Sequence, residues 1–156
     1  MDLPKRKKTR LEGYDYSSCG AYFVTICVKD RHQLLGEIMV GADIIRPPKP
    51  PLSQYGKIVE TSITQISSHY ENVLVDKYCI MPDHVHMIVF IMPDKNGRII
   101  SAPTLSQVIG SMKRWVTKQI GFSVWQKSFN DRIIRNEKGY QEVWQYIEEN
   151  PLKQKM

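Results

Sequence analysis

Residues 72–92 constrain the fold more than any other part of this chain, because two runs of strand-forming residues meet there across a very short connection. The first run, NVLVDKYCIM, and the second, HVHMIVFIM, are rich in β-branched and aromatic residues and are separated only by Pro-Asp. Parallel strands need a long crossover, whereas antiparallel strands can be joined by a tight turn. We therefore expect an antiparallel hairpin here.

The second run carries two histidines, His84 and His86, with one residue between them. Side chains at i and i+2 of a strand point to the same face, so both imidazoles should lie opposite Val85, Met87 and Val89. One interpretation is a pair of half-exposed surface histidines without a ligand. The other is two ligands of a metal site, which would need a third ligand from a distant segment.

Apolar periodicity and turn residues indicate the remaining elements. These are a strand at 21–29, a hairpin at 34–47, a connection at 46–52, a helix capped by Ser53, a loop at 93–98, a helix from Thr104 to Gly121, a mixed strand and turn at 123–136, and a helix at 137–150 closed by Pro151. Neighbouring strands with helices gathered between them predict an α+β fold, in which an antiparallel β-sheet carries helices on one face.

The composition fits a single domain that spans residues 1–156 and begins with a basic arm at residues 1–12. The formal net charge of +6 favours a polyanionic partner such as nucleic acid. The longest apolar run, residues 87–92, is too short to span a bilayer. The three cysteines have no metal-ligand spacing, so we expect reduced thiols in a cytoplasmic protein without a membrane partner.

The last predicted helix places two polar side chains at the border of an apolar stripe. At about 100° per residue, the stripe consists of Tyr140, Val143, Trp144 and Ile147. Tyr146 and Asn150 are an i, i+4 pair beside it, so a phenol and an amide are neighbours on the helix surface. A border tyrosine and a helix-capping asparagine are the structural interpretations of these residues, and a functional pair is the alternative.

The His-hydrophobic-His motif on a strand, followed by Tyr-x-x-x-Asn on a later helix, resembles the HUH single-tyrosine transposases, and in particular the REP-associated tyrosine transposases. The most specific matches are MPDHVHMIV and YIEENP, and the further matches are YFVTICVKDRHQLLG, VIGSMKRWVTKQI and VWQKSFNDRIIRNE. Members often carry histidine where this chain has Arg132, and many continue beyond the residue at which this chain ends. The resemblance implies an antiparallel sheet with helices, related to the ferredoxin-like and RRM-like folds.

Carried over by position, the resemblance implies a transposase, that is, a metal-dependent DNA endonuclease and strand transferase. His84 and His86 would bind a divalent metal, Mg²⁺ or Mn²⁺, with Asn150 as the third ligand. Tyr146 would be the catalytic nucleophile and would form a 5′-phosphotyrosine intermediate. The substrate would be single-stranded DNA cleaved at hairpin-flanked sites, and the protein would act as a monomer rather than a dimer.

Two other functions stay open on the sequence. One is a domesticated or inactive domain that binds hairpin DNA without cleaving it in the cell. The other is a metal-dependent hydrolase that uses an activated water and leaves no protein–DNA bond. Basic side chains suit a DNA backbone, although each could equally belong to a solvated surface. The candidate DNA contacts are Lys5, Arg6, Lys7, Lys8 and Arg10 in the arm, Lys113 and Arg114 on a helix, and Arg132 and Arg135 before the last helix.

Overall fold

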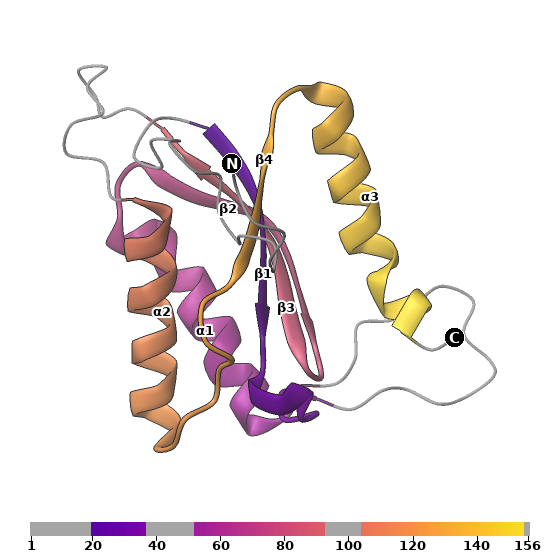
Figure 1. Cartoon of the computed structure of the whole chain (residues 1–156). Helices are drawn as coiled ribbons and strands as arrows, with labels where there is room; N and C mark the ends of the chain where they lie inside the picture. The colour runs from indigo at the N-terminus through magenta and orange to yellow at the C-terminus, as the bar shows by residue number, and fades with distance from the viewer. Residues whose placement is uncertain (1–19, 37–51, 93–103, 155–156) are drawn as a thin grey trace, which may run out of the picture.

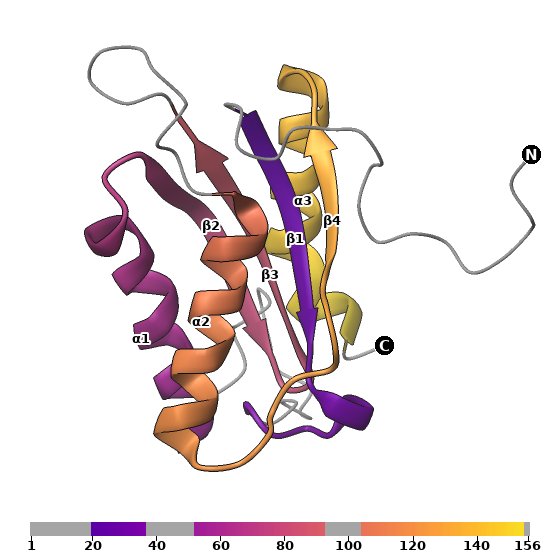
Figure 2. The same cartoon turned by 60° about the vertical axis from the view of Figure 1, so that its left-hand side comes forward.

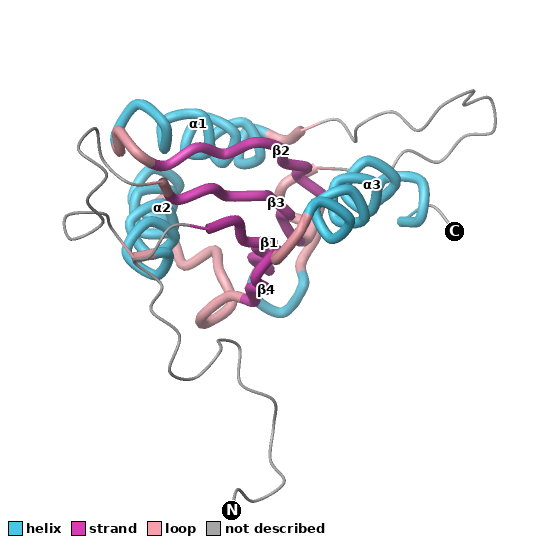
Figure 3. The backbone as a smooth tube through the Cα atoms, turned by 90° about the horizontal axis from the view of Figure 1, so that it is seen from above, coloured by secondary structure: helices cyan, strands magenta, loops and turns pink. Residues whose placement is uncertain are grey.

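Four antiparallel strands form one sheet in the structure, a computed structural model that describes residues 20–36, 52–92 and 104–154. The strands are β1 (Gly20–Cys27), β2 (Val73–Met81), β3 (His84–Ile91) and β4 (Asn130–Ile134). Figure 1 shows these strands, and their order, β2-β3-β1-β4, can be followed in Figure 3; each neighbouring pair is antiparallel. Only Pro82 and Asp83 separate β2 from β3, which confirms the predicted hairpin.

Helices cover both faces of this sheet. They are α1 (Gln54–His69), α2 (Leu105–Ile120) and α3 (Glu137–Gln154). Figure 2 shows α1 and α2 in front of the sheet with α3 behind it, and Figure 3 shows the same layers from above. The α+β class is confirmed, but the expectation that the helices lie on one face is wrong. The second face also carries apolar side chains, Met81 and Ile88 among them, and α3 removes these from water.

Local sequence signals set the ends of the first two helices. Ser53 caps α1, and its hydroxyl oxygen accepts a hydrogen bond from the Gly56 N–H at 3.1 Å. Thr104 caps α2 through a capping box with Gln107, which satisfies N–H groups that the helix leaves unpaired. Gly121 ends α2 at φ 98°, in the left-handed region that glycine adopts without steric cost. These boundaries confirm the sequence-based expectation.

The last helix is longer than predicted. α3 continues through Pro151 to Gln154, whereas the sequence favoured an end at Pro151. The fixed φ of proline is compatible with helical backbone, and its defect is the missing N–H that would donate to the carbonyl of Ile147. The helix therefore loses a hydrogen bond at this point without ending there.

The sheet face under α1 and α2 holds the main hydrophobic core. Alternate residues of the two central strands point into this core and pack on both helices: Tyr22, Val24 and Ile26 from β1, Val85, Met87 and Val89 from β3, Val59 and Ile63 from α1, and Val108 and Ile109 from α2. The intervening residues of β1 and β3 face α3 instead, because side chains alternate along a strand.

An irregularity in β2 allows two adjacent residues of this strand to contact α3. The register between β2 and β3 shifts between Val75 and Lys77, so Asp76 is an extra residue in the strand. The side chains of Asp76 and Lys77 both reach α3, where they bind Tyr140 and Glu148 respectively. A bulge of this kind redirects a side chain without changing the pairing on either side of it.

Several sequence-based expectations fall on residues outside the described ranges. These are the basic arm with Lys5, Arg6, Lys7, Lys8 and Arg10, most of the hairpin at 34–47, and the loop at 93–98. Where helices are described, none is both long and apolar enough to cross a membrane. Cys27 and Cys79 form no disulfide.

Candidate active site

His84 and His86 lie side by side between the sheet and α3. Each is 6% exposed, and their ring centroids are 4.6 Å apart. Both project from β3 toward α3, while Val85 and Met87 belong to the core on the other face. The prediction that the two imidazoles share one face is therefore confirmed, and their burial means that each needs a polar partner.

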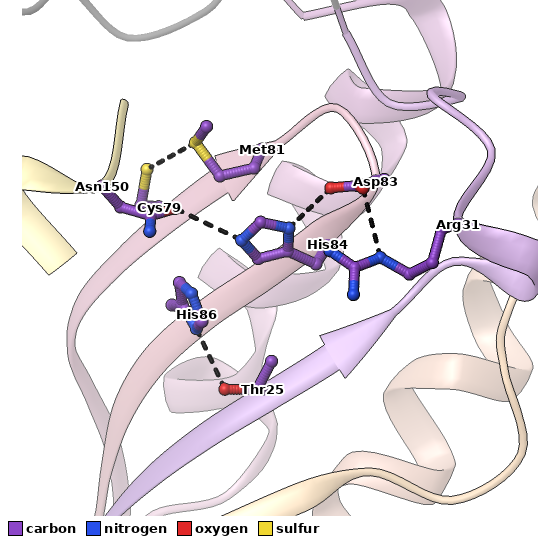
Figure 4. A network of polar contacts seen from close by, with 8 residues as sticks. All are labelled: Thr25, Arg31, Cys79, Met81, Asp83, His84, His86 and Asn150. Carbon is purple, nitrogen blue, oxygen red and sulfur yellow. Dashed lines mark hydrogen bonds and ion pairs between the residues drawn. The ribbon is translucent and has the colours of Figure 1, made fainter. Parts of the chain in front are cut away.

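Asp83 and Arg31 fix the orientation of the first imidazole (Figure 4). Asp83 Oδ1 lies 2.6 Å from His84 Nδ1, and Arg31 Nε donates to Asp83 Oδ2 at 3.1 Å. Burial alone would raise the pKa of Asp83, but the hydrogen bonds from His84 and Arg31 outweigh it, so the pKa is lowered. The ionised carboxylate accepts from Nδ1–H and leaves Nε2 to face away from it.

Asn150 brings an amide oxygen to that second nitrogen. The side chain is 5% exposed, and Oδ1 lies 3.2 Å from His84 Nε2. In a neutral His84 whose Nδ1 donates to Asp83, Nε2 carries a lone pair, so two acceptors face each other. A cation placed between them would satisfy both acceptors, which is the donor arrangement of a metal site.

His86 has an equivalent arrangement with a hydroxyl partner. Its Nδ1 lies 3.0 Å from Thr25 Oγ1, the residue that pairs with it across β1 and β3. Burial, together with the charges of His84 and Arg31, lowers the pKa of His86 to about 3. A neutral imidazole is the form that binds a metal ion, and the Thr25 hydroxyl can accept from Nδ1–H so that Nε2 is available as a ligand.

Tyr146 lies beside these groups but remains accessible. It is 39% exposed, and its ring centroid is 5.4 Å from that of His86 and 5.9 Å from that of Phe23. The i, i+4 pair predicted on the last helix therefore has one buried member, Asn150, and one exposed member, Tyr146. The structure thus brings together all four residues that the sequence singled out.

The described residues offer no conventional alternative ligand set. Within them, no three His, Cys, Asp or Glu side chains are grouped so that they could hold a metal ion. The candidate set is two imidazoles and one amide oxygen, which leaves coordination positions open to a substrate.

Tyr140, the other tyrosine of α3, has a different environment. It packs on the cluster formed by Cys79, Met81, Ile88, Val143 and Ile147, as the apolar stripe predicts. Its hydroxyl donates to Asp76 Oδ2 at 2.5 Å. This hydrogen bond raises the pKa of Tyr140 to about 12, so the phenol is held protonated and directed away from the histidines.

Trp144 departs from the predicted stripe. It is 37% exposed, and its ring lies against Lys77, whose Nζ is 3.9 Å from the ring centroid. Lys77 Nζ also donates to Glu148 at 2.7 Å. Trp144 therefore lies outside the buried cluster of α3, and the apolar face of this helix is narrower than predicted.

Two of the predicted basic residues lie on α2, across the sheet from the histidines. Lys113 Nζ donates to the carbonyls of Gln126 and Ser128 at 3.1 and 2.6 Å, so its charge holds a loop in place. Arg114 is exposed on the same helix. Neither is brought to the paired histidines.

The other two described basic residues lie on the side of α3. Arg132 and Arg135 line an open hollow of about 390 Å³ between β4 and the first turns of α3, together with Lys138 and Glu142. We call it the β4–α3 hollow. The Arg132 guanidinium lies 5.5 Å from the ring centroid of Phe23, the aromatic residue that also contacts Tyr146.

Sequence reasoning missed the residues that orient the histidines. Asp83 stands inside the MPDH segment, so its position next to His84 was a usable signal. Thr25 and Arg31 gave no such signal, because their contacts depend on the pairing of β1 with β3, which joins segments far apart in the chain.

No family model matches this sequence. A protein of Haemophilus influenzae without an assigned function is 32% identical, and the match covers 94% of this chain and 88% of that protein. A second protein of the same organism, named a candidate REP-associated tyrosine transposase, is 24% identical over 89% of this chain and 74% of that protein.

Two solved structures share the fold. One is a REP-associated tyrosine transposase bound to a REP hairpin, with a TM-score of 0.65 and 20% identity; the match covers 97% of this chain and 74% of that one. The other is a candidate transposase from Deinococcus radiodurans, with a TM-score of 0.50 and 18% identity over 94% of this chain and 98% of that one.

Proposed function

We propose that this chain is a REP-associated tyrosine transposase, as the names of one sequence relative and one structural neighbour suggest, and that it cleaves and rejoins single-stranded DNA beside a hairpin. In this proposal Tyr146 is the nucleophile, and His84, His86 and Asn150 hold a divalent ion. The observation that carries the proposal is the convergence of two buried imidazoles, a buried amide oxygen and an accessible phenol beneath α3.

The proposed ligand set suits a reaction at a phosphate. All three ligands are neutral, so a bound ion would keep its full positive charge for the substrate. Such an ion would polarise the scissile phosphate and stabilise negative charge in the transition state. Mixed nitrogen and oxygen ligands favour Mn²⁺, while Mg²⁺ prefers oxygen and would bind more weakly.

The protein itself supplies the orientation of these ligands. Asp83 accepts from one imidazole and Thr25 lies within hydrogen-bond distance of the other, so each ring can direct Nε2 toward Asn150 and Tyr146. Partners of this kind fix the tautomer of a ligating histidine and raise its basicity. The low pKa of His86 keeps that ring ready for a metal ion without a proton to displace.

Tyr146 suits a reversible step. Its Oη would attack the phosphorus and form a phosphotyrosine bond to the 5′ side, while the bond from phosphorus to the 3′ oxygen breaks. The phenol proton is lost and the released 3′ oxygen gains one, so protons balance. A phenol has a pKa of about 10, well below that of an alkyl alcohol. Tyrosine can therefore leave again when a DNA 3′-hydroxyl attacks, and no ATP is consumed.

The β4–α3 hollow offers a path for the DNA strand to this tyrosine. Arg132 and Arg135 lie along β4, and Lys138 lies on the α3 side of the hollow. Lys138 and Tyr146 are two i, i+4 steps apart along α3, through Glu142, so they share a side of the helix. A strand that follows these cations would reach the phenol from the edge of the sheet.

The site supports a monomeric enzyme. Both histidines come from β3, and Tyr146 and Asn150 come from α3 of the same chain, which packs on its own sheet through Val143 and Ile147. No residue from a second copy is needed to complete the set. We therefore propose that one chain binds one hairpin DNA and carries out the cleavage.

The test is the capture of a covalent adduct. Hairpin DNA with a single-stranded flank, labelled at either end, is incubated with the protein and Mn²⁺ and separated on a denaturing gel. We expect the label on the segment 3′ of the cleavage site to migrate with the protein, and EDTA to prevent this. The matched control is Tyr146→Phe, which keeps the ring and removes the hydroxyl.

The other outcomes identify the competing functions. Cleavage without an adduct would indicate a hydrolase that uses an activated water. Tight binding without cleavage in any divalent ion would indicate a hairpin-binding domain. Either result would contradict the proposed role of Tyr146.

A further inference from the structure

A second hollow lies at the end of β1. It has a volume of about 440 Å³. One wall is the 3₁₀ turn η1 (Lys29–Arg31), and the other is the segment 123–127, which includes Trp125 and Lys127. We call it the η1 hollow. None of its lining residues was among the DNA contacts expected from the sequence.

The η1 hollow is positively charged. Lys29, Arg31 and Lys127 line it, against the single carboxylate of Asp30. In the described part of the chain, the ammonium groups of Lys29 and Lys127 make no hydrogen bond or ion pair, and both residues are exposed. An exposed concave surface with this surplus of unpaired cations attracts an anion.

Arg31 links this hollow to the proposed metal site. Its Nε donates to Asp83, which in turn binds His84 (Figure 4). The side chain is still 55% exposed, and no described residue accepts a hydrogen bond from its two terminal nitrogens. These nitrogens form the flat pair of donors that binds a phosphate through two parallel hydrogen bonds.

Both walls of the η1 hollow are fixed by hydrogen bonds. The Lys29 N–H donates to the Val124 carbonyl at 2.9 Å, and the Gln126 N–H donates to the Cys27 carbonyl at 2.9 Å. Lys113 holds the second wall by its two bonds to loop carbonyls. The cations are therefore presented on a prearranged surface, which lowers the entropy cost of binding.

The backbone of η1 is itself unusual. Asp30 and Arg31 have φ values of 56° and 55°, and two successive non-glycine residues in the left-handed region are strained. Strain of this kind persists where the surroundings hold it, and it is concentrated at functional sites. Here it belongs to the turn that carries the Arg31 guanidinium between Asp83 and the hollow.

We propose that the η1 hollow binds a backbone phosphate of the single-stranded DNA, close to the phosphate that is cleaved. Arg31, Lys29 and Lys127 would contact this flanking phosphate, and the Arg31–Asp83–His84 chain would keep it near the metal ligands. The inference rests on the proposed function and adds a second point at which the strand is held, apart from the β4–α3 hollow.

The test compares two double variants of the full chain. Lys29→Gln/Lys127→Gln removes two cations from the η1 hollow but leaves Arg31 and Asp83 in place. Lys57→Gln/Lys118→Gln removes the same charge from exposed positions on α1 and α2, the helices that cover the other face. Binding of a fluorescent oligothymidylate is measured by anisotropy over a range of salt concentrations, and circular dichroism confirms that each variant is folded.

We expect the η1 variant to bind several-fold more weakly at low salt. Its plot of log affinity against log salt should be shallower by about 0.7 for each phosphate that the variant no longer binds, while the control keeps the wild-type slope. Equal slopes in the two double variants would overturn the proposal, because the weaker binding would then reflect net charge alone. Adduct formation by the wild-type protein is scored separately, so a failure of the proposed chemistry is distinguishable from a failure of this site.

Discussion

Replacing each tyrosine of α3 by phenylalanine should separate the stability of this protein from its chemistry. Tyr140 donates to Asp76 at 2.5 Å. A hydrogen bond to a charged acceptor contributes about 1.5–3 kcal/mol when buried and less near the surface. Because this pair is exposed, we expect Tyr140→Phe to lower the free energy of unfolding by about 1 kcal/mol. The midpoint of thermal unfolding should fall by about 2–4 °C for a chain of this length.

Tyr146→Phe should have the opposite effect, with almost unchanged stability and no adduct formation. The phenylalanine ring can keep the edge contacts with His86 and Phe23, and the tyrosine is already 39% exposed. We expect the free energy of unfolding to change by less than about 0.5 kcal/mol, as for most surface substitutions. The covalent DNA adduct should nevertheless disappear, because the attacking oxygen is gone.

Two measurements on the same samples distinguish the roles of Tyr140 and Tyr146. Urea unfolding followed by circular dichroism gives the stability of each variant, and the denaturing gel with hairpin DNA and Mn²⁺ gives the adduct. The adduct should survive in Tyr140→Phe and be absent in Tyr146→Phe. An adduct that persists without the Tyr146 hydroxyl, or that vanishes only with Tyr140→Phe, would refute the assignment of the nucleophile.

Four further predictions test other parts of the structure. His84→Ala should abolish Mn²⁺ binding measured by calorimetry, and unchanged binding would rule out this imidazole as a ligand. Asp83→Asn should weaken Mn²⁺ binding by about 10–100-fold, as loss of a ligand-orienting group does; wild-type affinity would make Asp83 purely structural. Burial and the hydrogen bond to Glu60 raise the pKa of Tyr78 to about 12. In urea unfolding, the wild-type protein should therefore be more stable than Tyr78→Phe by roughly 1 kcal/mol. This difference in stability should be fully present below about pH 10 and should vanish as the pH approaches 12. A difference that grows with pH would contradict that sign. Deleting residues 1–10 should flatten the salt dependence of hairpin binding, and an unchanged slope would show that the arm makes no phosphate contacts.

The parts of the site that the sequence predicts are those governed by local periodicity. A spacing of two along a strand is enough to place His84 and His86 on one face, and a spacing of four along a helix is enough to place Tyr146 beside Asn150. The caps at Ser53 and Thr104 are equally local. In each case the residues involved are at most four positions apart in the sequence, so the local backbone conformation determines how they lie.

The parts that the sequence could not predict depend on contacts between distant segments. Thr25 reaches His86 because of the register between β1 and β3, and no local pattern specifies that register. The exposed ring of Trp144 lies against Lys77, which follows a bulge in another strand. The placement of α3 on the second face likewise depends on apolar residues contributed by β2 and β3.

The bulge in β2 also ties α3 to an edge strand of the sheet at two points along the helix. The adjacent residues Asp76 and Lys77 bind Tyr140 in the first turn of α3 and Glu148 about two turns further along. Two contacts at different heights resist sliding of α3 along its own axis. An exposed pair such as Lys77–Glu148 nevertheless contributes only about 0.2–1 kcal/mol to stability. Burial of Val143 and Ile147 between these two contacts therefore contributes more than the polar pairs to holding Tyr146 and Asn150 over the histidines.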